Sequence, residues 1–170
     1  MSPFFIIFVI MGFESLRKSV KGLIKDLEKV DATVNRILSR KDVRQFIISM
    51  NTNEQLFDDG INSLGVKLED VRGDGYTDLT ISIKESKGQP TDRVTLKDTG
   101  AFYESFRIKL NKDSFEIIAD TNKGDTDLLQ EWGRDILGLT DENLQRLIDK
   151  IRTELREVIR QKIHARFDAA

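Results

Sequence analysis

Apolar side chains repeat with helical spacing along residues 13–38. They recur almost everywhere three or four positions apart, so they share one face of an α-helix and leave the charged side chains on the opposite face. The mixed charge, and the lack of aromatic side chains after Phe13, favour packing on protein over attachment to a membrane surface. The pattern predicts a long amphipathic helix with a stripe of Phe13, Leu16, Val20, Leu23, Ile24, Leu27, Val30, Val34, Ile37 and Leu38.

A second, shorter helix is predicted for residues 41–59. The polar run at residues 51–53 predicts an interruption, because such side chains favour turns. Asn53 then stands where it can cap a further turn that carries Leu56 and Phe57. The apolar positions before the interruption are Val43, Phe46, Ile47 and Met50.

The periodicity changes from helix to strand in residues 60–120. The alternation of Leu79, Ile81 and Ile83 predicts a strand over about residues 78–83, and residues 84–93 have the polarity of an exposed loop that can reach a partner. Two further strands are predicted over residues 102–110 and 114–119, joined by a turn at residues 111–113. A polar turn at residues 97–100 precedes them. Phe102 and Phe106 are expected to hold this sheet to the helices.

The last part of the chain returns to helical spacing. Asp125 and Asp127 are placed to cap a short helix over residues 128–132, and Trp132 is expected to anchor this acidic segment to the core. Thr140 is expected to cap a long final helix. The stripe of that helix comprises Leu144, Leu147, Ile148, Ile151, Leu155, Val158, Ile159 and Ile163.

These elements predict an α+β fold, in which long amino- and carboxy-terminal helices pack on a small, mainly antiparallel β-sheet. A chain of 170 residues with 39% hydrophobic residues can bury one sizeable core, so residues 13–170 are expected to form a single domain. Within it, residues 13–59 and 125–170 are the helical parts, and residues 60–120 are the loop and sheet part.

Residues 1–12 form an apolar amino-terminal extension. Its continuous apolar run, residues 3–11, is shorter than the ~20 residues that span a bilayer, and it lacks the basic start and small-residue cleavage site of a secretory signal. Two interpretations stay open. The run is either a translated extension upstream of a start at Met11, which we favour, or a segment buried against a neighbouring subunit.

Residue types limit the chemistry of this chain. It has no cysteine and one histidine, His164, in a helical stretch, so thiol catalysis, a histidine triad and a multi-histidine metal site within one chain are not expected. An EF-hand loop started at Asp120 would place Gly124 fifth and Asp125 sixth, where the motif needs an oxygen ligand and a glycine. We therefore expect no catalytic, cofactor-binding or metal-binding residues, and no enzyme.

The charge is unevenly distributed along the chain, although its formal sum is −2. Residues 13–44 hold nine Lys and Arg against five Asp and Glu, whereas residues 113–142 hold two against nine. Such asymmetry can steer subunits into a head-to-tail arrangement, or the two charged segments are simply solvent-exposed faces; both interpretations stay open. The Arg72-Gly73-Asp74 tripeptide is expected to be a turn and not an adhesion motif.

The segment LKDTGAFYESF, residues 96–106, resembles the L-x-x-TG-x-L/F-x-x-S-hydrophobic signature of small proteins of tailed bacteriophages. These are the HK97 gp10-like tail-completion proteins and the related virion-morphogenesis proteins. The resemblance extends through residues 55–65 before the signature and residues 132–140 after it, and covers roughly residues 55–155. Many relatives have a shorter amino-terminal region.

The resemblance implies a structural virion protein, assembled in the bacterial host cytoplasm, that joins the DNA-filled head to the tail. Its expected partners are further copies of itself in a ring, together with phage portal or connector proteins and tail proteins. No membrane and no specific nucleic acid are expected as partners, and the acidic segment is compatible with lining a DNA channel. The alternative is a non-viral helical adaptor that binds a partner through its amphipathic helices.

Overall fold

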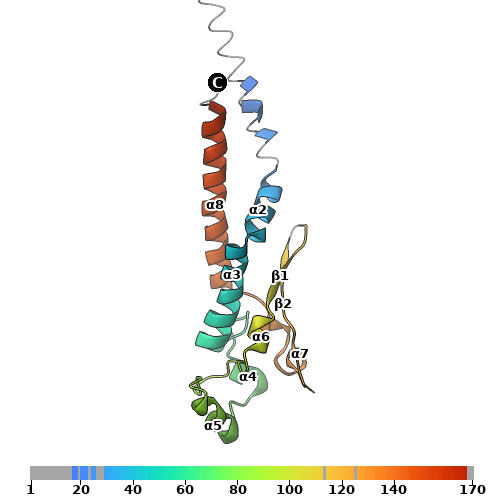
Figure 1. The fold of residues 1–170 in the computed structure, drawn as a ribbon, viewed down its shortest axis with the longest axis vertical. Coiled ribbons are helices and arrows are strands. Elements are labelled where there is room, and N and C mark those ends of the chain that lie inside the picture. The colour runs from blue at the N-terminus through green and yellow to red at the C-terminus, as the bar shows by residue number, and fades with distance from the viewer. Residues whose placement is uncertain are drawn as a thin grey trace, which may run out of the picture. The chain divides into compact units, whose positions relative to one another are not determined.

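The computed structural model describes residues 17, 18, 20–22, 24, 25, 29–112, 114–124 and 126–167. Helices predominate, and the strands of the described chain form two small antiparallel sheets, so the α+β class is confirmed in this general form (Figure 1). The elements are α2 (Val30–Ser39), α3 (Lys41–Ser49), the π-helix η1 (Met50–Asp59), α4 (Leu68–Arg72), α5 (Asp78–Ser86), α6 (Ala101–Glu104), β1 (Arg107–Leu110), β2 (Phe115–Ile118), β3 (Asn122–Lys123), β4 (Thr126–Asp127), α7 (Leu128–Trp132), the 3-10 helix η2 (Arg134–Ile136) and α8 (Asp141–Phe167).

The chain divides into two compact units. One is Leu38–Ile148, and the other combines Met1–Ile37 with Asp149–Ala170, as far as these residues are described. In the second unit, α2 forms the end of the first predicted helix, whereas much of residues 1–29, including the apolar extension, lies outside the described residues. α8 confirms the long final helix, and its apolar stripe after Asp149 is half-buried.

Buried amide side chains organise the unit of residues 38–148. η1 continues directly from α3 in the wider i→i+5 hydrogen-bonding pattern, so the interruption predicted at residues 51–53 is wrong. Asn51 is fully buried there: its Nδ2 donates to the carbonyl of Ile136 (3.2 Å), and its Oδ1 accepts from the N–H of Gly138 (3.0 Å). Asn51 can face the interior because both ends of its amide bond a second segment of the chain.

Gln55, one turn further along η1, repeats this arrangement. Its Nε2 donates to the carbonyl of Gly138 (3.0 Å), and its Oε1 accepts from the Thr140 N–H (3.0 Å) and from Nδ2 of buried Asn143 (2.9 Å). The Thr140 hydroxyl accepts from the Asn143 N–H (3.3 Å), which confirms the predicted cap of α8. Among the described residues, no buried side-chain nitrogen or oxygen lacks a hydrogen-bond partner.

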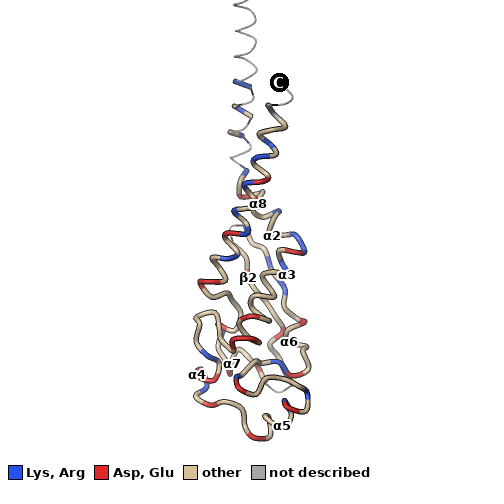
Figure 2. Tube along the Cα trace, turned by 90° about the vertical axis from the view of Figure 1, so that its left-hand side faces the viewer, with Lys and Arg blue, Asp and Glu red and all other residues tan. Residues whose placement is uncertain are grey.

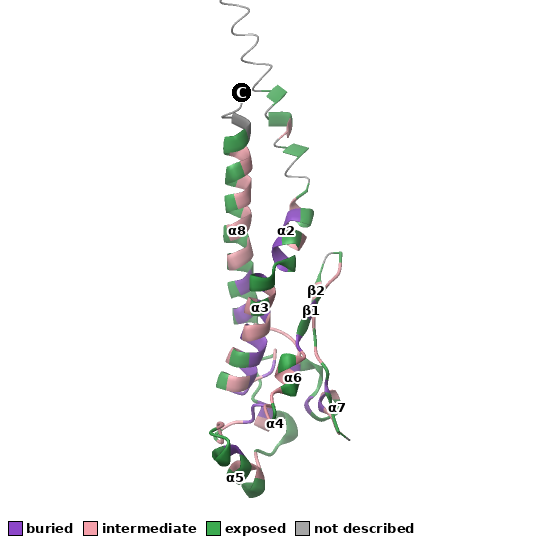
Figure 3. Ribbon diagram, viewed as in Figure 1, coloured by how far each residue is buried: buried purple, intermediate pink, exposed green. Residues whose placement is uncertain are grey.

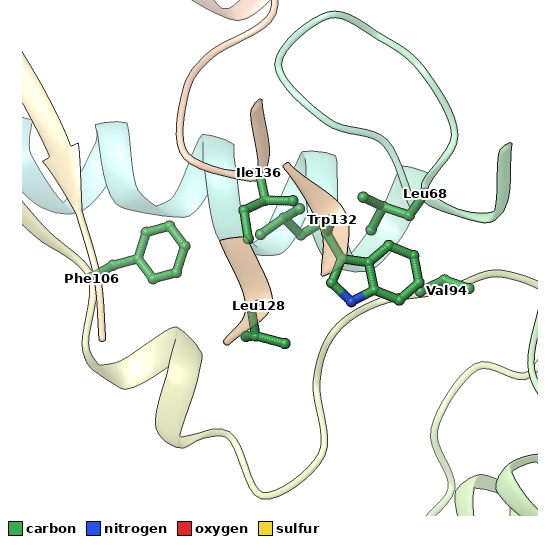
Figure 4. Packing of buried hydrophobic residues seen from close by; sticks show 7 residues of the cluster. Leu68, Val94, Phe106, Leu128, Trp132 and Ile136 are labelled. Atoms are coloured by element: carbon green, nitrogen blue, oxygen red, sulfur yellow. The ribbon is translucent and has the colours of Figure 1, made fainter. Parts of the chain in front are cut away.

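A hydrophobic cluster fills the space between η1, α4, α7 and the start of β1 (Figure 4). Trp132 belongs to this cluster, so its predicted role as a core anchor is confirmed, and Asp127 caps α7 by accepting from the Leu129 N–H (2.9 Å), also as predicted. Asp125 lies outside the described residues. The cluster comprises Leu56, Leu68, Val94, Phe106, Leu128, Trp132 and Ile136.

The predicted hairpin is confirmed in part. β1 and β2 pair antiparallel, with Arg107 opposite Ile118 and Leu110 opposite Phe115. The strand expected to begin at Phe102 is wrong in its first half, because residues 101–104 form the short helix α6. Its helical turn brings the ring of Phe102 edge-on to that of Phe106, with centroids 4.9 Å apart. A second hairpin pairs β3 with β4, strands of two residues each, in a part of the chain for which no strand was predicted.

The strand predicted over residues 78–83 is also wrong, because this segment is the helix α5. Thr77 caps it by accepting from the Thr80 N–H (3.3 Å), and Asp78 stands at its positive end. Leu79 is 72% exposed and Ile83 44% exposed, so the apolar alternation does not mark the buried face of a sheet. Lys84 is the buried position of α5, which is otherwise largely exposed in Figure 3, so the loop predicted for residues 84–93 begins only after Ser86.

The amide pairing predicts a large cost for Asn51→Leu. The substitution leaves the Ile136 carbonyl and the Gly138 N–H without their partner, so the free energy of unfolding should fall by at least about 2 kcal/mol. Asn53→Leu is the matched control, because Asn53 lies on the same helix but is exposed, and its amide donates to the Ser49 hydroxyl. This substitution should change the free energy of unfolding by no more than about 0.5 kcal/mol. Urea denaturation measures both, and equal effects would contradict the assignment.

The aromatic pair gives a second comparison. Phe106 is 1% exposed, so Phe106→Ala should lower the free energy of unfolding by about 3–5 kcal/mol. Phe102 is only partly buried, so Phe102→Ala should cost roughly half as much. Thermal unfolding of the two variants tests this order, and a larger loss for Phe102→Ala would show that the packing is assigned to the wrong ring.

Candidate functional site

A cavity of about 390 Å³ lies between α5, residues 94–98 and α7, and we name it the lysine cavity. Its volume is within the range of cavities that hold small ligands or inserted side chains. The apolar part of its wall is formed by Tyr76, Ile83, Val94, Leu96, Leu128 and Trp132. The charged part is formed by Lys84, Lys87, Lys97, Lys123, Asp98 and Glu131, so lysines outnumber carboxylates.

Thr95, fully buried behind this wall, fixes two tyrosines by hydrogen bonds. Its N–H donates to the Tyr76 hydroxyl (2.8 Å), and its carbonyl accepts from the Tyr103 hydroxyl. Burial raises the pKa of the Tyr103 hydroxyl above its ordinary value, and nearby Tyr76 and Asp58 add to this effect. Tyr103 therefore remains a neutral donor. Through these two bonds Thr95 links Tyr76, just before α5, to Tyr103 in α6.

Lys84 brings a buried positive charge to the cavity. Its side chain reaches three oxygens: Oε1 of Gln89 (3.1 Å), Oγ1 of Thr95 (3.3 Å) and the carbonyl of Lys97 (2.8 Å). Its Nζ also lies 4.7 Å from the centre of the Tyr76 ring. All four groups are neutral, so they solvate the ammonium without cancelling its charge, and the cavity favours negatively charged groups.

Asp98 connects two elements at the rim of the cavity. Its carboxylate accepts from Lys87 (2.6 Å), which directly follows α5, and lies 3.0 Å from Nζ of Lys123 in β3. These hydrogen bonds and charges lower the pKa of Asp98 to about 2. Both basic and acidic residues occur along the trace around α4 and α5 (Figure 2).

The signature segment supplies Leu96, Lys97 and Asp98 to the cavity wall, and its backbone turns sharply there. Leu96 has a φ of 55°, a left-handed conformation that is uncommon for a side chain of this size, and Gly100 has a φ of 98°, which favours glycine at the start of α6. The Thr99 hydroxyl accepts from the Ala101 N–H (3.3 Å), and the Ser105 hydroxyl accepts from the Asp120 N–H (2.9 Å). The Thr-Gly and Ser positions therefore shape a turn and attach it to the end of the hairpin.

The structure brings together the three segments that carry the sequence resemblance. Leu56, Phe106 and Trp132 come from different segments and belong to one hydrophobic cluster. The amide of Gln55 bonds the third segment at Gly138 and Thr140. These segments are far apart in the sequence, so their meeting in one core is a property of the fold.

Other candidate motifs take structural positions. Arg72 lies 3.4 Å from Asp74 and from Glu131, and its guanidinium lies 5.0 Å from the Trp132 ring centre, so the Arg-Gly-Asp tripeptide forms the turn after α4. His164 is exposed on α8, as predicted. No His, Cys, Asp or Glu residues of the described chain form a group of three that could hold a metal ion. None of the described helices has the length and apolar character needed to cross a bilayer.

Lys84 and Thr95 are the site residues that the sequence analysis did not identify. In the sequence, Lys84 directly follows Ile83, but this is a weak signal of a buried lysine, because the same pattern fits a solvated helix face. The buried acceptors that distinguish the two come from residues 89–97, which only the fold places beside α5.

The chain matches no protein-family model, no curated protein and no solved structure at a significant level.

The lowered pKa of Asp98 predicts a pH dependence. A carboxyl with a pKa near 2 in the folded protein and 3.8 in the unfolded chain stabilises the fold above about pH 5 and loses this contribution as the pH falls toward 2. The difference in unfolding free energy between the wild type and Asp98→Asn should therefore shrink over that interval. Urea denaturation at several pH values measures it, and high salt should reduce the difference because these side chains are partly exposed. A pH-independent difference would contradict the assignment.

Proposed function

We propose that this protein is a structural component of a tailed-phage virion, a neck or tail-completion protein that joins the DNA-filled head to the tail as a ring of copies. The proposal rests on one observation above all: the three segments that resemble these phage proteins, although distant in sequence, share one core, and the amide of Gln55 joins the first of them to the third. If the three short motifs matched by chance, nothing would require their segments to pack together in one core. The signature thus contributes to the fold and to an exposed cavity wall.

The exposed apolar side chains of the unit at residues 38–148 support an assembly role. Leu64 is 69% exposed, and Ile83, which lines the lysine cavity, is 44% exposed. Exposed apolar residues are common on monomers, but large ones next to charged cavities are typical of surfaces that bind other proteins. In a ring, each subunit repeats the same contacts, so assembly strength comes from many interfaces and not from one site.

The proposal includes the finer architecture that the sequence predicts, with long terminal helices packed on the small sheet. Its partners are further copies of this chain, portal or connector proteins and tail proteins, and its location is the virion, after assembly in the host cytoplasm. The half-buried apolar stripe of α8 is also what the alternative requires, a non-viral helical adaptor that binds a partner through its amphipathic helices.

Light scattering on the purified full chain tests the proposed function, alone and with phage portal and tail proteins, next to a version that starts at Met11. A closed ring, or a monomer that assembles on a phage connector, is the expected result. A monomer or dimer that is indifferent to those proteins would refute the proposal and favour the adaptor. If only the Met11 version gives a defined ring, residues 1–10 are not needed for assembly.

A further inference from the structure

The loop between η1 and α4 presents an apolar side chain on a rigid support. Ile61 and Lys67 form an antiparallel bridge at its base, and Leu64 at its tip is 69% exposed. Buried Asn62 holds the tip: its Oδ1 accepts from the N–H groups of Leu64 and Val66, both at 3.0 Å, and its own N–H donates to the Val66 carbonyl (2.9 Å). We name residues 61–67 the Leu64 knob.

The Leu64 knob is also fastened to the body of its unit. The Ser63 N–H donates to the Asp135 carbonyl (2.8 Å), and Ser63 packs so closely on Gly138 that a Cβ at position 138 would lie 2.9 Å from the Ser63 Cβ. A loop fixed in this way loses little conformational freedom on binding, so burial of its leucine contributes to affinity with a small entropic cost.

Acidic side chains surround the knob. A second cavity of about 470 Å³ is lined by Leu64 and Gly65 together with Glu54, Asp59, Asp141 and Glu142. The one cation in its lining is Arg146, which bonds Glu54. Lys67, at the base of the knob, is paired with Glu69 (3.5 Å), so the side of the knob that faces this cavity is negatively charged.

The lysine cavity has the complementary properties. Its lining holds four lysines and two carboxylates, and both carboxylates already have cationic neighbours, Asp98 through Lys87 and Lys123, and Glu131 through Arg72. Its apolar wall offers contact area for an inserted side chain, with Ile83, 44% exposed, at the cavity. The two linings have no residue in common, so a knob and a cavity that bind each other must belong to different copies.

We propose that the Leu64 knob of one copy inserts into the lysine cavity of the next, in a head-to-tail contact that specifies how copies of this chain associate. The acidic residues beside the knob face the lysines, and this attraction orients the two copies. The leucine packs against the apolar wall of the cavity. Such a contact joins unlike surfaces and repeats from copy to copy, so it generates a ring or a filament. This inference rests on the proposed function, because it names the surfaces through which that ring would form.

The test uses full-length variants with one half of the contact removed. Leu64→Asn removes the apolar side chain of the knob without adding a charge that the lysines would attract, and Ile83→Asp places a charge in the apolar wall of the cavity. Each alone should weaken self-association at least about thirtyfold, the effect of losing a dominant interface residue. Leu79→Asp is the matched control, because Leu79 is the more exposed of the two α5 residues and does not line the cavity, so it should associate as the wild type does.

Mixing the two defective variants identifies the direction of the contact. Leu64→Asn retains a working cavity and Ile83→Asp retains a working knob, so an equimolar mixture should give a heterodimer that does not grow further. Light scattering measures the masses, alone and on a phage connector, and circular dichroism melts establish that each variant is folded. Folded variants that assemble normally, a mixture that stays monomeric, or equal disruption by Leu79→Asp would overturn the proposed contact.

The outcomes separate this inference from the proposed function. If the wild type assembles and Leu64→Asn does so equally well, the contact is wrong and the phage role stands. If the wild type assembles neither alone nor on a connector, both are wrong. If Leu64→Asn abolishes connector binding while the mixture forms no heterodimer, the knob binds a phage partner and not a second copy, which also overturns the contact.

Discussion

The pairing of two buried amides with the chain that leads into α8 is the constraint on which the rest of this structure depends. Asn51 and Gln55 stand on one side of η1, and together they bond backbone groups at Ile136, Gly138 and Thr140. The cost of leaving such buried groups unpaired fixes the position of this segment more narrowly than apolar packing does. The segment in turn positions Trp132 and the first turn of α8.

The same principle builds the lysine cavity on the other side of the core. Thr95 and Lys84 are buried because neighbouring oxygens and tyrosines satisfy them, and they hold α5 beside residues 94–98. Polar groups thus decide how the segments are arranged around a small apolar cluster. This explains how a chain with 33% charged residues and modest hydrophobic content keeps a defined surface.

That surface combines rigidity with charge. The Leu64 knob is held by Asn62 and carries acidic neighbours, whereas the lysine cavity is held by Thr95 and carries basic ones. A net charge of −2 conceals this separation. For a protein proposed to repeat the same contact around a ring, two unlike and complementary surfaces on one subunit are what head-to-tail assembly requires.

The sequence by itself determined α3, the β1–β2 hairpin, α7 with its Asp127 cap, and α8 with its Thr140 cap, because local periodicity and capping encode these elements. Only the tertiary structure decided the unbroken η1, the helical α5 and α6, and the cavity. For η1 and α5 the physical reason is that partners outside the helix satisfy the buried polar residues: residues 136–143 satisfy Asn51 and Gln55, and residues 89–97 satisfy Lys84. Read alone, a buried asparagine or lysine has the same local pattern as a solvated one.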